Sequence, residues 1–191
     1  MAEQDPFDSL ESFKWASEND PSLICAISFL RSLEELNFDV AQYILDSGYK
    51  INTLVCEPPV SILHWLSAHS GPYSKKPHHR NVEIAKWLIA RGADLNAIDH
   101  RGQTPIFYAI NGLDCIEYLR LLIQSGARVN FPELFEMAES VSTPEIVQLL
   151  VSFGCPALSI EEKIRLVNDR NCKADQEMAE FLRRTTPRLI K

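Results

Sequence analysis

The densest group of side chains that could do chemistry lies between residues 70 and 81. Three fixed positive charges and two adjacent histidines gather there: Lys75, Lys76, His78, His79 and Arg80. Such a group suits an acidic peptide, a phosphate or RNA. Two imidazoles could also hold a metal, but the segment offers no carboxylate or cysteine to complete a site. The sequence therefore leaves open an anion-docking loop or a plain solvated loop, and it predicts no metal.

Sequence motifs of catalysis are absent. The chain has no P-loop, no dinucleotide-binding glycine pattern, no HExxH and no GxSxG. We therefore expect no enzymatic activity and no cofactor, with an unrecognised enzyme or a small-molecule binder as the alternative. The cysteines are odd in number and lack a CxxC pair, which favours reduced thiols in an intracellular protein, cytoplasmic or nuclear: Cys25, Cys56, Cys115, Cys155 and Cys172.

Composition and charge narrow the class further. The 191 residues are 46% hydrophobic and 24% charged, as in globular proteins, and the formal net charge is −7. That charge disfavours general attraction to nucleic acid or to an anionic membrane. The amino end is acidic, unlike a secretory signal, and the apolar run 23–27 is too short to span a bilayer. We expect no membrane contact.

Four amphipathic stretches reveal how these residues must be arranged, because each ends at a glycine: Gly48, Gly92, Gly126 and Gly154. The spacings are 44, 34 and 28 residues, and the first falls to 33 when the eleven residues 70–80 are set aside. Glycine readily adopts the left-handed conformation that ends a helix. Thr104 and Pro105 suit a helix start, the Thr hydroxyl accepting a backbone amide. The pattern predicts helices over 104–111 and 115–125.

The same residues carry a family resemblance. DHRGQTPI at 99–106, followed by LLIQSGARVN at 121–130, resembles the ankyrin repeat pattern DxxGxTPL with a later LLxxGADVN. GADLNA at 92–97 repeats the second motif, and SILHW at 61–65 keeps the Leu and His of the family's TPLH. The resemblance implies an all-α solenoid of about four helical hairpins, with short β-hairpin or turn fingers and helical caps at both ends.

The resemblance also predicts how the chain is divided. We expect an amino-terminal capping helix at 1–19, four repeats over 20–157 and, at 158–191, carboxy-terminal capping helices with a basic tail. The expected repeats are 20–52, 53–96, 97–130 and 131–157, with an insertion at 70–81 in the second. The packing between helices and repeats is expected to use these side chains: Ile106, Ala109, Leu119, Leu121 and Leu122.

In function, the resemblance implies a protein-binding module that acts as an adaptor, scaffold or inhibitor through its concave face. We expect another protein as the partner and a monomer when free. Alignment of the repeats predicts a column of one variable position from each: Cys25, Trp65, Tyr108 and Glu136. The tip of the third repeat's finger adds His100, Arg101 and Gln103.

Some of these side chains have an alternative role in packing. Trp65, Tyr108 and Arg101 are of the types that dominate interface energies, but the two aromatic residues could instead fill gaps between neighbouring helices. His64, at the family's TPLH histidine, is expected to hydrogen-bond backbone. Asn96 resembles hairpin asparagines that are hydroxylated, although bonding within the turn is the simpler role.

Charge is unevenly distributed along the chain. Residues 1–70 hold 3 basic and 11 acidic side chains, residues 71–131 hold 8 and 5, and residues 132–191 hold 8 and 10. An acidic first repeat therefore precedes a basic middle. This distribution keeps local docking of RNA, another anion or an acidic peptide as the alternative function.

Overall fold

The computed structural model describes residues 5–55, 57–68, 78–111, 116–130, 134 and 144–154. Within these residues the chain is helical, with one isolated β-bridge and no strand. Three helical pairs follow one another: α2 (Ala26–Glu34) with α3 (Phe38–Asp46), α4 (Ile62–Ala68) with α5 (His78–Ala90), and α6 (Pro105–Asn111) with α7 (Ile116–Gln124). The flanking elements are α1 (Leu10–Asn19), two 3-10 turns (Pro6–Asp8 and Pro21–Leu23) and α9 (Pro144–Ser152).

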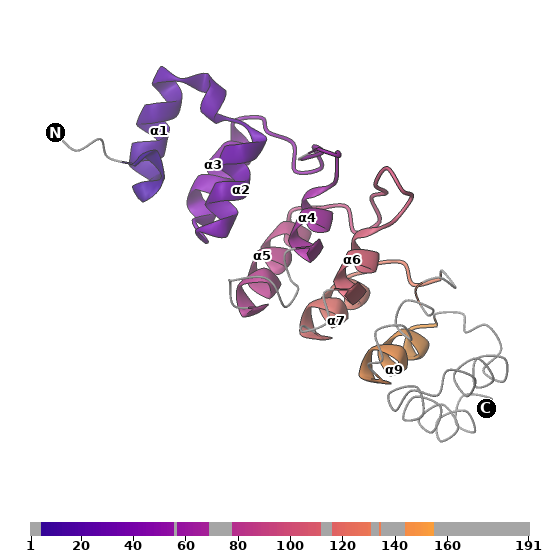
Figure 1. Cartoon of the computed structure of the whole chain (residues 1–191). Coiled ribbons are helices and arrows are strands. Elements are labelled where there is room, and N and C mark those ends of the chain that lie inside the picture. The colour runs from indigo at the N-terminus through magenta and orange to yellow at the C-terminus, as the bar shows by residue number, and fades with distance from the viewer. Residues whose placement is uncertain are drawn as a thin grey trace, which may run out of the picture.

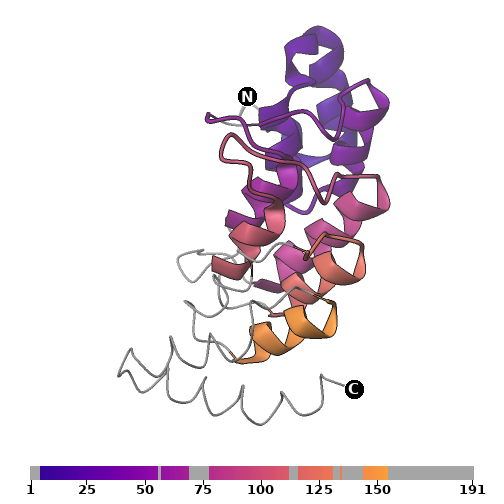
Figure 2. The same ribbon diagram turned by 90° about the vertical axis from the view of Figure 1, so that its right-hand side faces the viewer.

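The pairs form a stack. Helix α4 packs on α6, α5 on α7, α7 on α9, and α1 on α3 (Figure 1). Seen from the side, the order of the helices along the stack is their order along the chain (Figure 2). The connections that follow α3, α5 and α7 leave the same edge of the stack, and we call them the first, second and third fingers (Figure 1). This arrangement confirms the expected all-α solenoid of helical hairpins.

Helices α3, α5, α7 and α9 end as the glycine spacing predicts, because the four glycines that follow them have a positive φ: Gly48, Gly92, Gly126 and Gly154. At Gly92 φ is +82°, and the amide of Ala93 reaches back to the carbonyl of Leu88 at 3.1 Å. At Gly126 the amide of Ala127 makes the same contact with Leu122 at 3.0 Å. These bonds satisfy carbonyls at the end of the helix, and the chain turns into the next finger.

Helix α2 ends without a glycine. Leu36 takes the left-handed conformation instead, with φ +58°, and the amide of Asn37 donates to the carbonyl of Ser32 at 2.8 Å. Asn37 then begins α3, because its side-chain oxygen accepts the amide of Val40 at 3.2 Å. The turn between α2 and α3 is therefore closed by backbone bonds and one cap, with a leucine in the left-handed region.

Two sequence expectations were wrong: that the Thr104 hydroxyl caps a helix, and that residues 78–81 belong to a loop. Helix α6 begins at Pro105 as predicted, but the hydroxyl of Thr104 is buried and accepts no amide. Helix α5 begins at His78 and has 13 residues where α3 and α7 have 9 each, so residues 78–81 lengthen a helix and are not part of a loop. The Arg80 guanidinium donates to the carbonyl of Glu34 at 2.7 Å, which ties this extra turn to the end of α2.

The apolar core runs through every pair of the stack. Each described helix from α2 onwards contributes at least one leucine or isoleucine with no exposed surface, for example Leu33, Ile44, Leu63, Leu88, Ile106, Leu122 and Leu150. Of the expected packing residues, Ile106, Leu119 and Leu122 are buried, while Ala109 and Leu121 are half-buried against the same core. Each pair thus buries its apolar face on its neighbours.

Aromatic rings fill the junction between the first and second pairs. Phe38 stacks on Trp87 with ring centroids 5.4 Å apart, and Phe29 lies 6.3 Å from the same indole. The Arg91 guanidinium covers Trp87 at 3.7 Å and donates to the Gln42 amide oxygen at 2.6 Å. Rings from α2, α3 and α5 therefore carry the packing at this junction.

Candidate partner-binding surface

The second finger, which leads into the third repeat, is closed by the buried carboxylate of Asp99. Asp99 Oδ1 accepts the amides of Arg101 and Gln103, both at 2.8 Å, and the Asp99 amide donates to the Gln103 carbonyl at 3.0 Å. Burial alone would raise the pKa of Asp99, but the bonds from Tyr108 and the two amides outweigh it and hold the pKa below its usual value. This turn fixes the backbone of the fingertip and leaves His100 and Arg101 exposed.

His64 joins helix α4 to the second finger. Its Nε2 lies 2.9 Å from the carbonyl of Gln103, and its Nδ1 lies 2.8 Å from the hydroxyl of Ser61. A carbonyl only accepts, so Nε2 carries the proton and Nδ1 accepts from Ser61. Burial lowers the pKa of His64, which keeps the ring neutral near pH 7. The expected structural role of this histidine is confirmed.

Tyr108 and Trp65 occupy equivalent positions, four residues after Thr104 and Ser61 respectively. The Tyr108 hydroxyl donates to Asp99 Oδ2 at 2.7 Å, a bond that, with burial, raises the pKa of Tyr108. Its ring meets His64 edge-on, with centroids 5.4 Å apart. Trp65 is half-buried against the core. Both aromatic side chains therefore pack within the stack, and only part of each is exposed.

Cys25 does not share that position. It precedes α2 as Ser61 precedes α4, so Phe29, which is fully buried, takes the place equivalent to Trp65. The expected column therefore does not pass through Cys25; the first repeat lacks the Thr-Pro pair that sets the register in the third. The thiol lies 3.6 Å from the hydroxyl of Ser28. Burial alone would raise the pKa of Cys25, but the Ser28 amide and hydroxyl favour the thiolate and lower it.

The structure describes some of the other predicted site residues and not the rest. Gln103 is half-buried, and its backbone amide and carbonyl hold the finger closed. Arg80 contributes its guanidinium to the contact with α2, and the backbone of His78 and His79 lies in the first turn of α5. Lys75, Lys76 and Glu136 lie outside the described residues.

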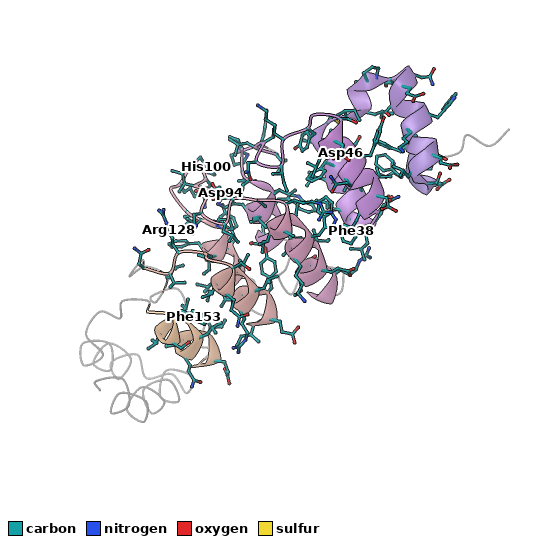
Figure 3. All side chains as sticks on the ribbon, turned by 180° about the vertical axis from the view of Figure 1, so that it is seen from behind. Phe38, Asp46, Asp94, His100, Arg128 and Phe153 are labelled. Carbon is teal, nitrogen blue, oxygen red and sulfur yellow. The ribbon has the colours of Figure 1, made fainter. Side chains whose placement is uncertain are left out.

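Asparagine side chains clamp each finger to the next. Asn52 donates from its side-chain nitrogen to the carbonyl of Gly92 at 3.1 Å and accepts the amide of Asp94 at 2.9 Å. Asn96 repeats the pattern, donating to Gly126 at 3.4 Å and accepting the amide of Arg128 at 2.8 Å. Asn96 therefore bonds the following finger and not only its own turn. The clamps set the spacing of the edge on which Asp94, His100 and Arg128 lie, while Phe38 lies at the far end of α3 (Figure 3).

Two apolar side chains on this edge were not found by sequence reasoning. Leu54 in the first finger is 52% exposed and Ile98 in the second is 67% exposed. Each stands six residues after its glycine, Gly48 or Gly92, so the two hold the same register. That shared spacing was the available signal.

Neither a group of metal ligands nor a membrane-spanning helix is found in the described part of the chain. No group of three or more histidine, cysteine, aspartate or glutamate side chains there is placed to hold a metal ion. Nor does any helix among those residues have the length and apolar character needed to cross a membrane.

Comparison with known proteins agrees with this architecture. The family described as ankyrin repeats, in three copies, matches residues 23–133. A human ankyrin repeat domain-containing protein 13B is 33% identical over 125 residues, covering 54% of this chain and 20% of that protein. The mouse protein of the same name is 35% identical over 98 residues, covering 46% and 16%.

A nematode relative, the Ankyrin repeat and LEM domain-containing protein 1 homolog of Caenorhabditis elegans, is 39% identical over 70 residues, which is 37% of this chain and 9% of the relative. The chain thus spans at most about a fifth of the length of these relatives. The family match covers more than half of the chain. The chain belongs to the ankyrin repeat family.

Proposed function

We propose that this protein acts as an adaptor, scaffold or inhibitor by binding a partner protein along its finger edge. Ankyrin repeats generally mediate binding to other proteins and are typically non-enzymatic. The observation that carries the proposal is the pair Leu54 and Ile98, exposed at the same register position of successive fingers. Burying a whole leucine or isoleucine side chain is worth roughly 1.5–3 kcal/mol, so the pair offers a partner a substantial apolar contact.

The edge is organised before a partner arrives. The Asn52 clamp fixes the first finger against the second, and the Asp99 turn fixes the tip that carries Arg101. A surface that is already ordered loses less conformational entropy on binding. Arg101 then adds a cation of the kind often found among the strongest interface contacts.

Affinity capture from native cells with quantitative mass spectrometry tests the proposal. The bait variant Leu54→Ser/Ile98→Ser should lose a specific partner, and Arg101→Ala should weaken capture of the same protein. Both Leu54 and Ile98 are exposed, so the fold should survive, and a circular dichroism melt checks this.

Ile27→Ser is the matched control, because Ile27 is an isoleucine with 78% exposure on α2 and not on a finger. Loss of the same partner with Ile27→Ser, or its full retention by Leu54→Ser/Ile98→Ser, would contradict the finger edge as the binding surface. The alternative of anion docking predicts instead that neutralising Lys75 and Lys76 removes a salt-sensitive interaction.

A further inference from the structure

Helix α1 exposes a tryptophan between two glutamates. Trp15 is 70% exposed, the largest side chain among the exposed hydrophobic residues that the structure describes. Glu11 lies four residues before it and Glu18 three residues after it, and both are exposed. Side chains at these spacings are neighbours on one helix face. We call Glu11, Trp15 and Glu18 the acidic tryptophan face.

Lys14, the basic residue of α1, lies three residues after Glu11 and four before Glu18, but it forms no ion pair with either glutamate. Its ammonium instead lies 5.5 Å from the centre of the Tyr43 ring on α3. The ion pairs found among the described residues both belong to Arg31. Glu11 and Glu18 therefore face solvent beside an exposed indole.

The same unit shows what such a set of groups binds. Arg31 lies over the ring of Phe7 at 4.2 Å, while its guanidinium bonds the carboxylates of Asp5 and Glu35. An aromatic ring and two carboxylates together hold one half-exposed arginine at the surface of the fold. The acidic tryptophan face offers the same three kinds of group, with an indole as its aromatic ring, which is the strongest aromatic partner for a cation.

We propose that the acidic tryptophan face binds an arginine-containing basic segment of a partner protein. The surrounding charge favours such a ligand, because residues 5–48 hold nine acidic and two basic side chains. The same charge opposes a second copy of this face and an anionic membrane, since both would bring like charges together. Arginine suits the site better than lysine because its planar group can stack on the indole while its N–H groups reach the carboxylates.

The probe is a short fluorescent peptide of alternating arginine and alanine, titrated with the full chain and followed by anisotropy. Its lysine counterpart should bind more weakly. Trp15→Ala should weaken arginine-peptide binding about threefold, as expected for an exposed cation–π contact, and Trp15→Phe should restore part of it. Glu11→Gln/Glu18→Gln should weaken binding about fivefold, because two flanking carboxylates are lost.

Two matched controls separate this site from general attraction to an acidic protein. Asp39→Asn/Asp46→Asn removes two exposed carboxylates from α3 and should change binding less than twofold. Ile27→Ala truncates an exposed apolar side chain on α2 and should leave binding unchanged. Equal losses in the two charge variants, or no effect of Trp15→Ala, would overturn the proposal. So would Trp15-dependent self-association, measured by light scattering, because the occupant would then be a second copy. None of these readouts involves the finger edge, so this proposal and the proposed function can fail separately.

Discussion

At the scale of single residues, the second finger depends on three side chains that each satisfy a different neighbour. His64 reaches from α4 to the carbonyl of Gln103, Asp99 holds two amides of the turn, and Tyr108 donates to Asp99 from α6. Together they join two first helices to one fingertip. Removing any one leaves a buried or half-buried polar group without its partner, which is costlier than losing an exposed bond.

Protonation of His64 should make stability depend on pH. Because burial lowers the pKa of His64 in the folded state, the unfolded chain takes up the proton first as pH falls. Stability from this group is complete above about pH 6.5, the value for an unperturbed histidine, and is lost as the pH falls from there towards the folded pKa. Urea unfolding at neutral and mildly acidic pH should show this loss in the wild type and much less of it in His64→Gln. The exposed His100→Gln control should keep the wild-type dependence.

Tyr108→Phe should show how much the hydrogen bond from Tyr108 to Asp99 stabilises the fold. It removes the hydroxyl that bonds Asp99 and keeps the ring, so the free energy of unfolding should fall by about 1–2 kcal/mol. In an Asp99→Asn background the same change should cost less, because the ion acceptor is already gone. Chemical denaturation of all four proteins measures the coupling, and an unchanged stability in Tyr108→Phe would show that the bond carries no net energy.

At the scale of elements, fingers are held to fingers by side-chain amides and helices end at left-handed turns. Asn52 and Asn96 each use both their donor and their acceptor on the following finger. Backbone groups in a finger have no helix partner of their own, so these bonds satisfy donors and acceptors that would otherwise need water. The edge therefore keeps a regular spacing although the described fingers contain no strand.

Replacing Asn96 with Ala should loosen the third finger from the second. The Arg128 amide and the Gly126 carbonyl lose their partner, which should lower the free energy of unfolding by about 1 kcal/mol. Hydrogen exchange gives the local test, because the Arg128 amide should exchange faster while the Asp94 amide, held by Asn52, keeps its protection. Equal acceleration at both amides would mean that the clamp acts on the whole stack.

The sequence predicted those features of the elements that depend on local conformation. Glycine-ended helices follow from the left-handed residue alone, so Gly92 and Gly126 were enough to find the period. The left-handed Leu36 was not predictable, because a leucine there is held by the tertiary fold and by the bond from Asn37 to Ser32. The Asp99–Tyr108 bond joins residues of different elements, and no spacing rule identifies such a contact.

At the scale of the whole molecule, one apolar core runs through the described pairs, while acidic side chains gather in the first part of the sequence and basic ones in the middle. The core was predictable from the apolar periodicity of Ile106 and Leu122. Leu54 and Ile98 share a spacing of six residues from a glycine, but apolar periodicity assigns any leucine or isoleucine to the core and so hides that these two are exposed. Cys25 was misplaced for a related reason, since only an apolar pattern was available to align the first repeat.

Leu122→Ala should lower the free energy of unfolding by roughly 2–5 kcal/mol, because Leu122 is fully buried between repeats. Ile98→Ala removes a similar volume from an exposed fingertip and should change stability by less than about 0.5 kcal/mol. Thermal melts of the two variants make the comparison. A small effect of Leu122→Ala would remove this residue from the core that carries the stack.

The links between repeats also bear on how fast the chain reaches this structure. In the described part of the chain, side-chain bonds between neighbouring repeats join residues from 30 apart, at Asn96 and Gly126, to 51 apart, at Ser67 and Tyr118. Contacts of this short sequence range require only small loops to close, which favours rapid folding. Because each repeat meets only its neighbours, ordering can begin in any one of them and spread in both directions.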